Sequence, residues 1–85
     1  MTRRILWTAR ARKSLERLDA GTRARISERV EQLAASGSGD VKRLVAVEPP
    51  EYRLRVGDWR VRFEMESQPG VVVILEVLHR REAYR

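Results

Sequence analysis

Several residue types are scarce or missing in this chain of 85 residues. It has no cysteine, which excludes disulfides, thiolate nucleophiles and cysteine-ligated zinc. His79 is the single histidine. No apolar run approaches the roughly 20 residues of a membrane helix, and the N-terminus lacks the apolar stretch of a signal peptide. We therefore expect a cytoplasmic protein with no membrane partner, no metal and no other cofactor.

Lysine is also rare, because only Lys13 and Lys42 among the 18 lysines and arginines are lysines. Against 12 Asp and Glu, the net charge is +6 at pH 7, which favours a polyanionic partner such as nucleic acid. Arginine is the cation whose planar fork matches a phosphate bidentately and stacks on bases. A high genomic GC content would also enrich arginine, so the argument depends on where the arginines lie.

Apolar periodicity predicts a strand followed by a helical hairpin in the first half of the chain. The strand covers Arg4 to Trp7, and Thr8 is expected to cap a first helix. Thr22 is expected to cap a second helix, which stops at the Gly/Ser stretch 36–39. Between these points the apolar stripes are Ala11, Leu15 and Leu18, then Ile26, Val30, Leu33 and Ala34. The helical arginines are expected to face solvent: Arg10, Arg12, Arg17, Arg23, Arg25 and Arg29.

From residue 51 onward the apolar period changes to two, which predicts strands at 52–56, 59–66 and 71–78. Gly57-Asp58 and Pro69-Gly70 supply the turns. The predicted core face carries Tyr52, Leu54, Val56, Val61, Phe63, Met65, Val71, Val73, Leu75 and Val77. Two helices can cover only this face. We therefore expect residues 1–85 to form a single two-layer α+β domain, in the order β-α-α-β-β-β with an antiparallel three-strand meander, whose other sheet face is open.

The hairpin register gathers arginines on that open face. If Val56 and Trp59 flank the turn, the opposing pairs are Arg55 with Arg60 and Arg53 with Arg62. Like charges directly opposite destabilise a sheet by a few tenths to about 1 kcal/mol per pair. An anionic ligand is therefore expected there, with Arg53, Arg55 and Arg60 available to it.

Carboxylates on the same face allow two interpretations. Glu76 can pair with Arg62, and Glu64 and Glu66 can neutralise other cations. The three could instead bind a metal, but the interleaved arginines would compete with a dication. We therefore expect salt bridges.

Apolar residues and the C-terminal segment complete the expected surface. The assumed register places Val72, Ile74 and Leu78 on the open face, as apolar contacts for a protein partner. The last strand ends beside Gly57-Asp58, so a further group is expected near the arginines: His79, Arg80, Arg81 and Tyr84.

The segments YRLRVGDWRVRFE (52–64) and VVILEVLHRREAYR (72–85) resemble the RelE branch of the RelE/ParE toxin superfamily, and the order of elements matches over essentially the whole chain. This resemblance implies a type II toxin with a cognate antitoxin. Such a toxin would be an mRNA interferase, an endoribonuclease that enters the ribosomal A site and cuts mRNA after the 2′-hydroxyl attacks the adjacent phosphate. Two alternatives stay open: a ParE-type DNA gyrase inhibitor, which shares the fold, and a non-catalytic RNA- or ribosome-binding domain, which needs only the electrostatics.

The resemblance also implies roles for single residues. Arg53 and Arg55 would hold phosphate or prime the 2′-hydroxyl, and Arg60 would stabilise the phosphorane. Arg80 would serve the leaving 5′-oxygen, and Tyr84 would stack on or orient the base. The remaining substrate-binding residues would be Arg62, His79 and Arg81.

The general base is open. Some family members have lysine at the positions of Arg53 and Arg55, and arginine is a poor base because it keeps its proton. His79, ribosomal RNA and the substrate itself are the candidates. Either Arg80 or Arg81 can be the family's terminal arginine, and we expect Arg80 because it directly follows the strand.

Overall fold

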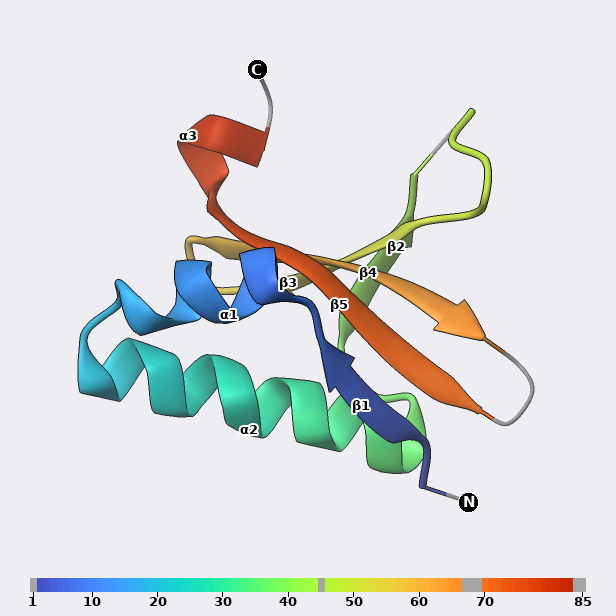
Figure 1. The fold of residues 1–85 in the computed structure, drawn as a ribbon, viewed down its shortest axis with the longest axis horizontal. Coiled ribbons are helices and arrows are strands. Elements are labelled where there is room, and N and C mark those ends of the chain that lie inside the picture. Colours follow the sequence, from blue (N-terminus) through green and yellow to red (C-terminus); the bar gives the residue numbers. More distant parts are fainter. Residues whose placement is uncertain (1, 45, 67–69, 84–85) are drawn as a thin grey trace.

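The computed structural model describes residues 2–44, 46–66 and 70–83. Its elements follow the chain as drawn in Figure 1: β1 (Arg4–Trp7), α1 (Ala9–Glu16), α2 (Ala20–Ser36), β2 (Asp40–Arg43), β3 (Tyr52–Val56), β4 (Trp59–Glu66), β5 (Val71–His79) and α3 (Arg80–Ala83). The expected α+β fold is confirmed. β2 and α3 are additions that the sequence did not predict.

Polar side chains and one glycine fix the ends of the two long helices. Thr8 caps α1 as expected, because its hydroxyl accepts the backbone N–H of Ala11 at 3.1 Å. The predicted Thr22 cap of α2 is wrong. The cap is Asp19, whose carboxylate accepts both the N–H (3.1 Å) and the hydroxyl (2.6 Å) of Thr22, and a carboxylate is favoured at the positive end of a helix. Gly37 ends α2 at φ 74°, which glycine adopts without strain.

The strands form one mixed sheet in the order β1-β5-β4-β3-β2. β1 is parallel to β5, and the other neighbouring pairs are antiparallel. β5 therefore lies between two strands, as its nearly continuous apolar sequence predicts. The missed strand, β2, has the sequence DVKR, and all four residues are exposed. It lacks the alternation of buried and polar residues by which a strand is recognised.

A β-bulge changes the register between β4 and β5. Arg62 pairs with Glu76, as expected, but Phe63 pairs with Ile74, so Leu75 is the extra residue. A one-residue insertion exchanges the two faces of the strand beyond it. The regular register that the sequence suggested therefore holds on only one side of the bulge.

The bulge overturns part of the predicted core. Val72 and Ile74, expected on the open face, are fully buried. Val71 and Val73, expected in the core, lie on the open face and are half-buried. Leu78 lies on the side of the bulge where the expected register holds. It pairs with Arg60 on the open face, as expected.

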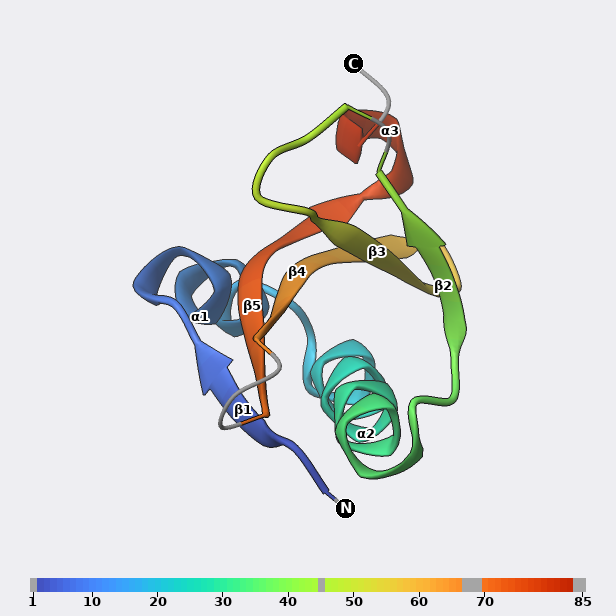
Figure 2. The ribbon, with the colours of Figure 1, turned by 90° about the vertical axis from the view of Figure 1, so that its right-hand side faces the viewer.

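The two long helices leave one side of the sheet uncovered. α2 crosses one face, and β1 and α1 follow one another along the outer edge of β5 (Figure 2). The buried core between these layers consists of Ala11, Ile26, Val30, Leu33, Ala34, Leu54, Val56, Val61, Phe63, Val72, Ile74 and Val77. α3 and the segment between β2 and β3 rise on the opposite side, around the open face (Figure 2). No helix in the described ranges is long and apolar enough to cross a membrane.

Candidate functional site

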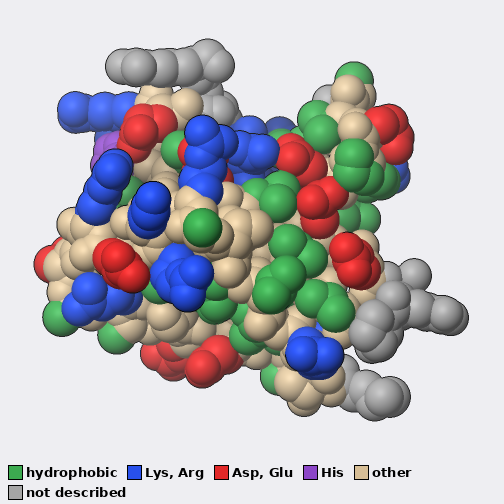
Figure 3. All heavy atoms as spheres, in the orientation of Figure 1, with side chains coloured by type: hydrophobic (Ala, Val, Ile, Leu, Met, Phe, Trp, Pro, Cys, Tyr) green, Lys and Arg blue, Asp and Glu red, His purple; other side chains and the backbone are tan. Residues whose placement is uncertain are grey.

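Two rows of side chains cross the open face from strand to strand. The register confirms both predicted arginine pairs, and β2 extends each row. From β2 to β5, the rows are Lys42, Arg53, Arg62 and Glu76, then Asp40, Arg55, Arg60 and Leu78. Figure 3 shows Lys and Arg side chains gathered over α1 and between α1 and α3, whereas hydrophobic side chains lie over β1. The described part of the molecule therefore has a strongly basic side next to an apolar edge.

Arg62 lies at the centre of an ion-pair network. Its Nη1 atom is 2.6 Å from Glu76 Oε1, and its Nη2 atom is 3.0 Å from Glu51 Oε1. Burial alone would lower the pKa of Arg62, but the bonds to Glu51 and the charges of both carboxylates outweigh burial and raise it. Glu76 was the predicted partner, whereas Glu51 was missed. One more step of the hairpin register puts Glu51 diagonal to Arg62, and that was the available signal.

Arg60 is held against the hairpin turn. Its Nη1 atom donates to the carbonyl oxygens of Gly57 (2.9 Å) and Trp59 (3.0 Å), and only 6% of the residue is exposed. These two bonds orient the guanidinium. Arg60 is thus positioned by the turn, whereas Arg55 in the same row is exposed.

The same turn holds the start of α3. The backbone N–H of Arg80 donates to the Asp58 carbonyl at 2.8 Å, and Arg80 Nε lies 3.8 Å from Asp58 Oδ1. The expected end of β5 beside Gly57-Asp58 is confirmed. Arg60 and Arg80 therefore share one two-residue turn as their support. Asp58 was read only as a turn residue, so its second role as an ion-pair partner was missed.

His79 is fixed by contacts on both sides. Its ring packs edge-on against Trp59, with centroids 5.2 Å apart, and its Nδ1 accepts the backbone N–H of Arg81 at 3.3 Å. This contact occupies Nδ1 and leaves Nε2 as the ring nitrogen that can meet a ligand. Tyr84, the last predicted site residue, lies outside the described residues.

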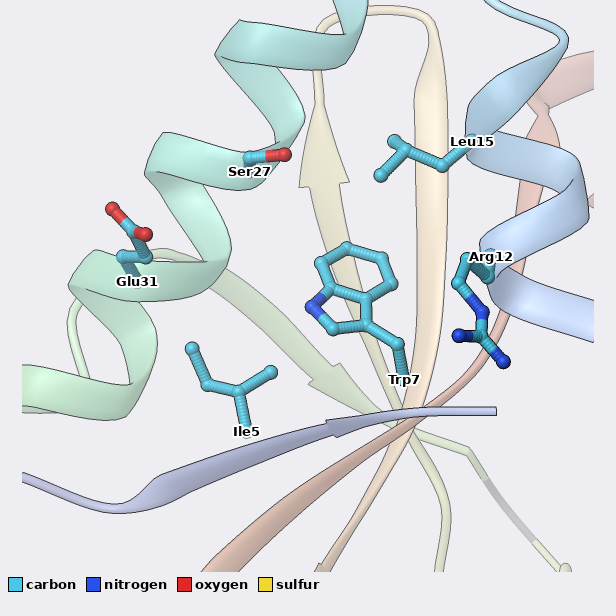
Figure 4. A pocket seen from close by; sticks show the side chains of 6 residues that line it. All are labelled: Ile5, Trp7, Arg12, Leu15, Ser27 and Glu31. Carbon is cyan, nitrogen blue, oxygen red and sulfur yellow. The ribbon is translucent and has the colours of Figure 1, made fainter. Parts of the chain in front are cut away.

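Two hollows beside the sheet were not predicted. One, of about 450 Å³, lies between β1, α1 and α2, where Trp7 points between the helices near Leu15 and Ile5 (Figure 4). The other, also about 450 Å³, is polar and is lined by Arg10, Lys13, Ser14, Arg17 and Glu76. Arg10 Nε is 3.7 Å from Glu76 Oε2, so this hollow adjoins the Arg62 network.

Across residues 2–44, 46–66 and 70–83, no three His, Asp or Glu side chains are grouped as metal ligands would be. The site that the described residues form is therefore a cationic face, with carboxylates that hold particular arginines. Such a face can bind phosphates and stabilise negative charge that develops on them.

Comparison with known proteins gives this face its context. A model of the family described as "ParE toxin of type II toxin-antitoxin system, parDE" matches residues 5–84. The fold and this match define a toxin of the RelE/ParE superfamily, as the sequence resemblance implied. The chain belongs to the ParE toxin family of type II toxin–antitoxin systems. No curated protein sequence matches it.

Several solved structures share the fold over nearly the whole chain. The archaeal RelE–RelB complex from Pyrococcus horikoshii OT3 aligns at 27% identity, covering 94% of this chain and 97% of that one, with a TM-score of 0.79. The toxin–antitoxin complex RelBE2 from Mycobacterium tuberculosis aligns at 25% identity, covering 93% and 99%, with a TM-score of 0.80. The RelB–RelE complex from Methanococcus jannaschii aligns at 26% identity, covering 93% and 94%, with a TM-score of 0.71. All three are complexes of a toxin with its antitoxin, which supports a cognate antitoxin as a partner of this chain.

Proposed function

We propose that this toxin is a ribosome-dependent endoribonuclease that cuts mRNA in the A site and thereby inhibits translation in the cytoplasm. The observation that most supports the proposal is the shared support of Arg60 and Arg80. The Arg60 guanidinium donates to the Gly57 carbonyl, and the backbone N–H of Arg80 donates to the Asp58 carbonyl, so both residues lie at the turn beside the second arginine row.

The proposed reaction is a transesterification within the message. The 2′-oxygen loses its proton and forms a bond to the adjacent phosphorus, the bond from phosphorus to the 5′-oxygen breaks, and the 5′-oxygen gains a proton. The products are a 2′,3′-cyclic phosphate and a 5′-hydroxyl. Negative charge grows on the phosphoryl oxygens and the leaving oxygen, which preorganised cations stabilise best.

Each arginine has a place in this reaction. Arg60 stabilises the charge on the phosphorane oxygens, and Arg80 donates a hydrogen bond to the leaving 5′-oxygen, which takes its proton from water. Arg55 is exposed and binds the scissile phosphate together with Arg53. Arg62 acts through position, because its ion pairs hold the centre of the face.

The remaining roles concern the nucleobase and the proton of the 2′-hydroxyl. Tyr84 stacks on the nucleobase, and His79 and Arg81 contact the RNA nearby. The proton of the 2′-hydroxyl leaves to His79, to ribosomal RNA or to the substrate itself. The cations supply the charge stabilisation that a metal gives in other nucleases.

A second function has a specific observation in its favour. The matching family model is that of ParE toxins. Resemblance to a ParE-type toxin implies a protein that inhibits DNA gyrase by binding to it. The arginine rows favour cleavage of RNA, but a cationic face can also bind other anionic surfaces. A non-catalytic ribosome-binding domain would use the same face.

Mapping of message ends separates these functions. Brief expression of the toxin is followed by primer extension on translated messages, while plasmid supercoiling is measured in the same cells. New 5′ ends inside codons that disappear with Arg60→Ala but persist with Arg23→Ala support the nuclease. Arg23 is exposed on α2, away from the open face, and so controls for the loss of one charge. Unchanged messages with altered supercoiling would instead establish the gyrase inhibitor.

A further inference from the structure

One face of α1 carries a line of cations. Arg10, Lys13 and Arg17, with Ser14 between them, have the three- and four-residue spacing that brings side chains onto one side of a helix. Together they line the polar hollow of about 450 Å³ that reaches Glu76 on the sheet. The sequence predicted only a solvated helix face here.

The spacing of these cations has a cost within the helix, because like charges three or four residues apart repel one another. Arg10 also lies in the first turn, where a cation opposes the helix dipole and no acidic residue offsets it. Lys13 in the last turn and Arg17 at the C-cap lie where the dipole favours a cation, so the dipole explains only part of the arrangement. In the described parts of the chain, neither Lys13 nor Arg17 forms a salt bridge, and the Arg10 pair with Glu76 is long at 3.7 Å.

The hollow is continuous with the arginine rows. Glu76 contributes one oxygen to Arg62, at 2.6 Å, and directs the other toward Arg10. Its single negative charge is thus shared between the sheet and α1, and the hollow keeps an excess of positive charge. Figure 3 shows the Lys and Arg side chains over α1 merging with those toward α3.

We propose that Arg10, Lys13 and Arg17 form a second phosphate-binding surface, which holds backbone phosphates of the same single RNA strand that lies on the open face. The strand crosses the sheet along the arginine rows, passes Glu76 and continues over α1. This surface rests on the proposed function, because it extends the path of an RNA that the open face binds. The α1 surface increases the length of RNA in contact with the protein, and none of its residues contacts the reacting atoms.

Salt-dependent binding tests the proposal. The full chain, freed from its antitoxin, is titrated with a 2′-O-methylated single-stranded RNA that it cannot cut, by fluorescence anisotropy at several salt concentrations. The test variant carries Lys13→Gln and Arg17→Gln, and the matched control carries Arg23→Gln and Arg29→Gln on exposed positions of α2. Both variants lose two charges, and glutamine keeps the helix propensity. Circular dichroism establishes that both are folded.

The expected result is a selective change in the test variant. The slope of log affinity against log salt is negative, and loss of two phosphate contacts reduces its magnitude by about 1.4, since each contact on a single strand contributes about 0.7. The control keeps the wild-type slope. Equal slopes in all three proteins would overturn the proposal, and so would a loss confined to an RNA duplex titrated in parallel, because α1 would then contact structured RNA.

The outcome for the proposed function is read separately, from wild-type cleavage of translated messages. If the wild type cuts messages but has the same salt slope as the test variant, the nuclease proposal is retained and the α1 surface is refuted. If the wild type cuts no message, but the salt dependence of RNA binding weakens in the test variant and not in the control, the nuclease proposal is refuted and the α1 surface is supported. A wild type that binds no single-stranded RNA overturns the surface.

Discussion

Replacing Ile74 tests the β-bulge and, with it, which side chains face a partner. Ile74 is fully buried. Ile74→Ala removes three carbons from the core, a transfer loss of about 2.4 kcal/mol at about 0.8 kcal/mol per carbon. The cavity left behind brings the expected loss of unfolding free energy into the range of about 2–5 kcal/mol. In a domain of this size that corresponds to a fall in Tm of at least about 10 °C.

Val73 is the matched control, because it is the neighbouring residue on the half-buried open face. Val73→Ala should lower the unfolding free energy by less than about 1 kcal/mol, since much of the side chain already contacts water. Both variants are measured by thermal and urea unfolding followed by circular dichroism. Equal losses, or a larger loss for Val73→Ala, would refute the bulged register and return Ile74 to the open face.

The remaining predictions concern the site and one helix cap. Arg60→Ala and Arg80→Ala should each lower the cleavage rate by about 10²–10³, the usual effect of removing one group that stabilises the transition state. Each should also abolish growth inhibition in a colony assay. Undiminished toxicity of both folded variants would refute the site assignment. Cleavage should survive EDTA once ribosome integrity is controlled separately, and rescue of lost activity by substoichiometric manganese would overturn this. The bond from the Thr22 hydroxyl is the main cause that lowers the pKa of Asp19. Asp19 therefore stabilises the fold above its unfolded pKa, and this contribution disappears as pH falls through the lower folded pKa, so Asp19→Ala should show a weaker acid dependence of Tm than wild type.

Most of the fold could be predicted because its signals are local. The hairpin register depends only on a two-residue turn, and that turn fixes the pairs of Arg53 with Arg62 and Arg55 with Arg60. Helix stripes depend on spacing along one segment. β2 could not be predicted, because an exposed edge strand has no buried face to leave a pattern. Asp40 and Lys42 of this strand nevertheless extend the two charged rows on the open face.

The bulge at Leu75 was unpredictable for a different reason. The run from Val71 to Leu78 is apolar on both sides except at Glu76, so either register buries valine, isoleucine or leucine. Pairing with β1 decides the matter, because Ile5 and Trp7 lie opposite Val72 and Ile74 on the core side. Such a long-range pairing is not visible in a single segment. The predicted apolar surface for a partner was therefore wrong for Val72 and Ile74, whose places on the open face are taken by Val71 and Val73, and right for Leu78.

Of the three carboxylates expected to form salt bridges, Glu76 pairs with Arg62, whereas in the described residues Glu64 and Glu66 form none. Glu51 and Glu76 hold Arg62, and Asp58 holds Arg80. An unconstrained arginine loses up to about 2 kcal/mol of rotamer entropy when a ligand fixes it. Cations that are already fixed would avoid that loss in the proposed binding of RNA. Adjacent like charges weaken the folded sheet, but the carboxylates offset the repulsion at chosen positions and leave Arg55 exposed. This pattern of paired and exposed arginines supports the proposed binding of phosphates.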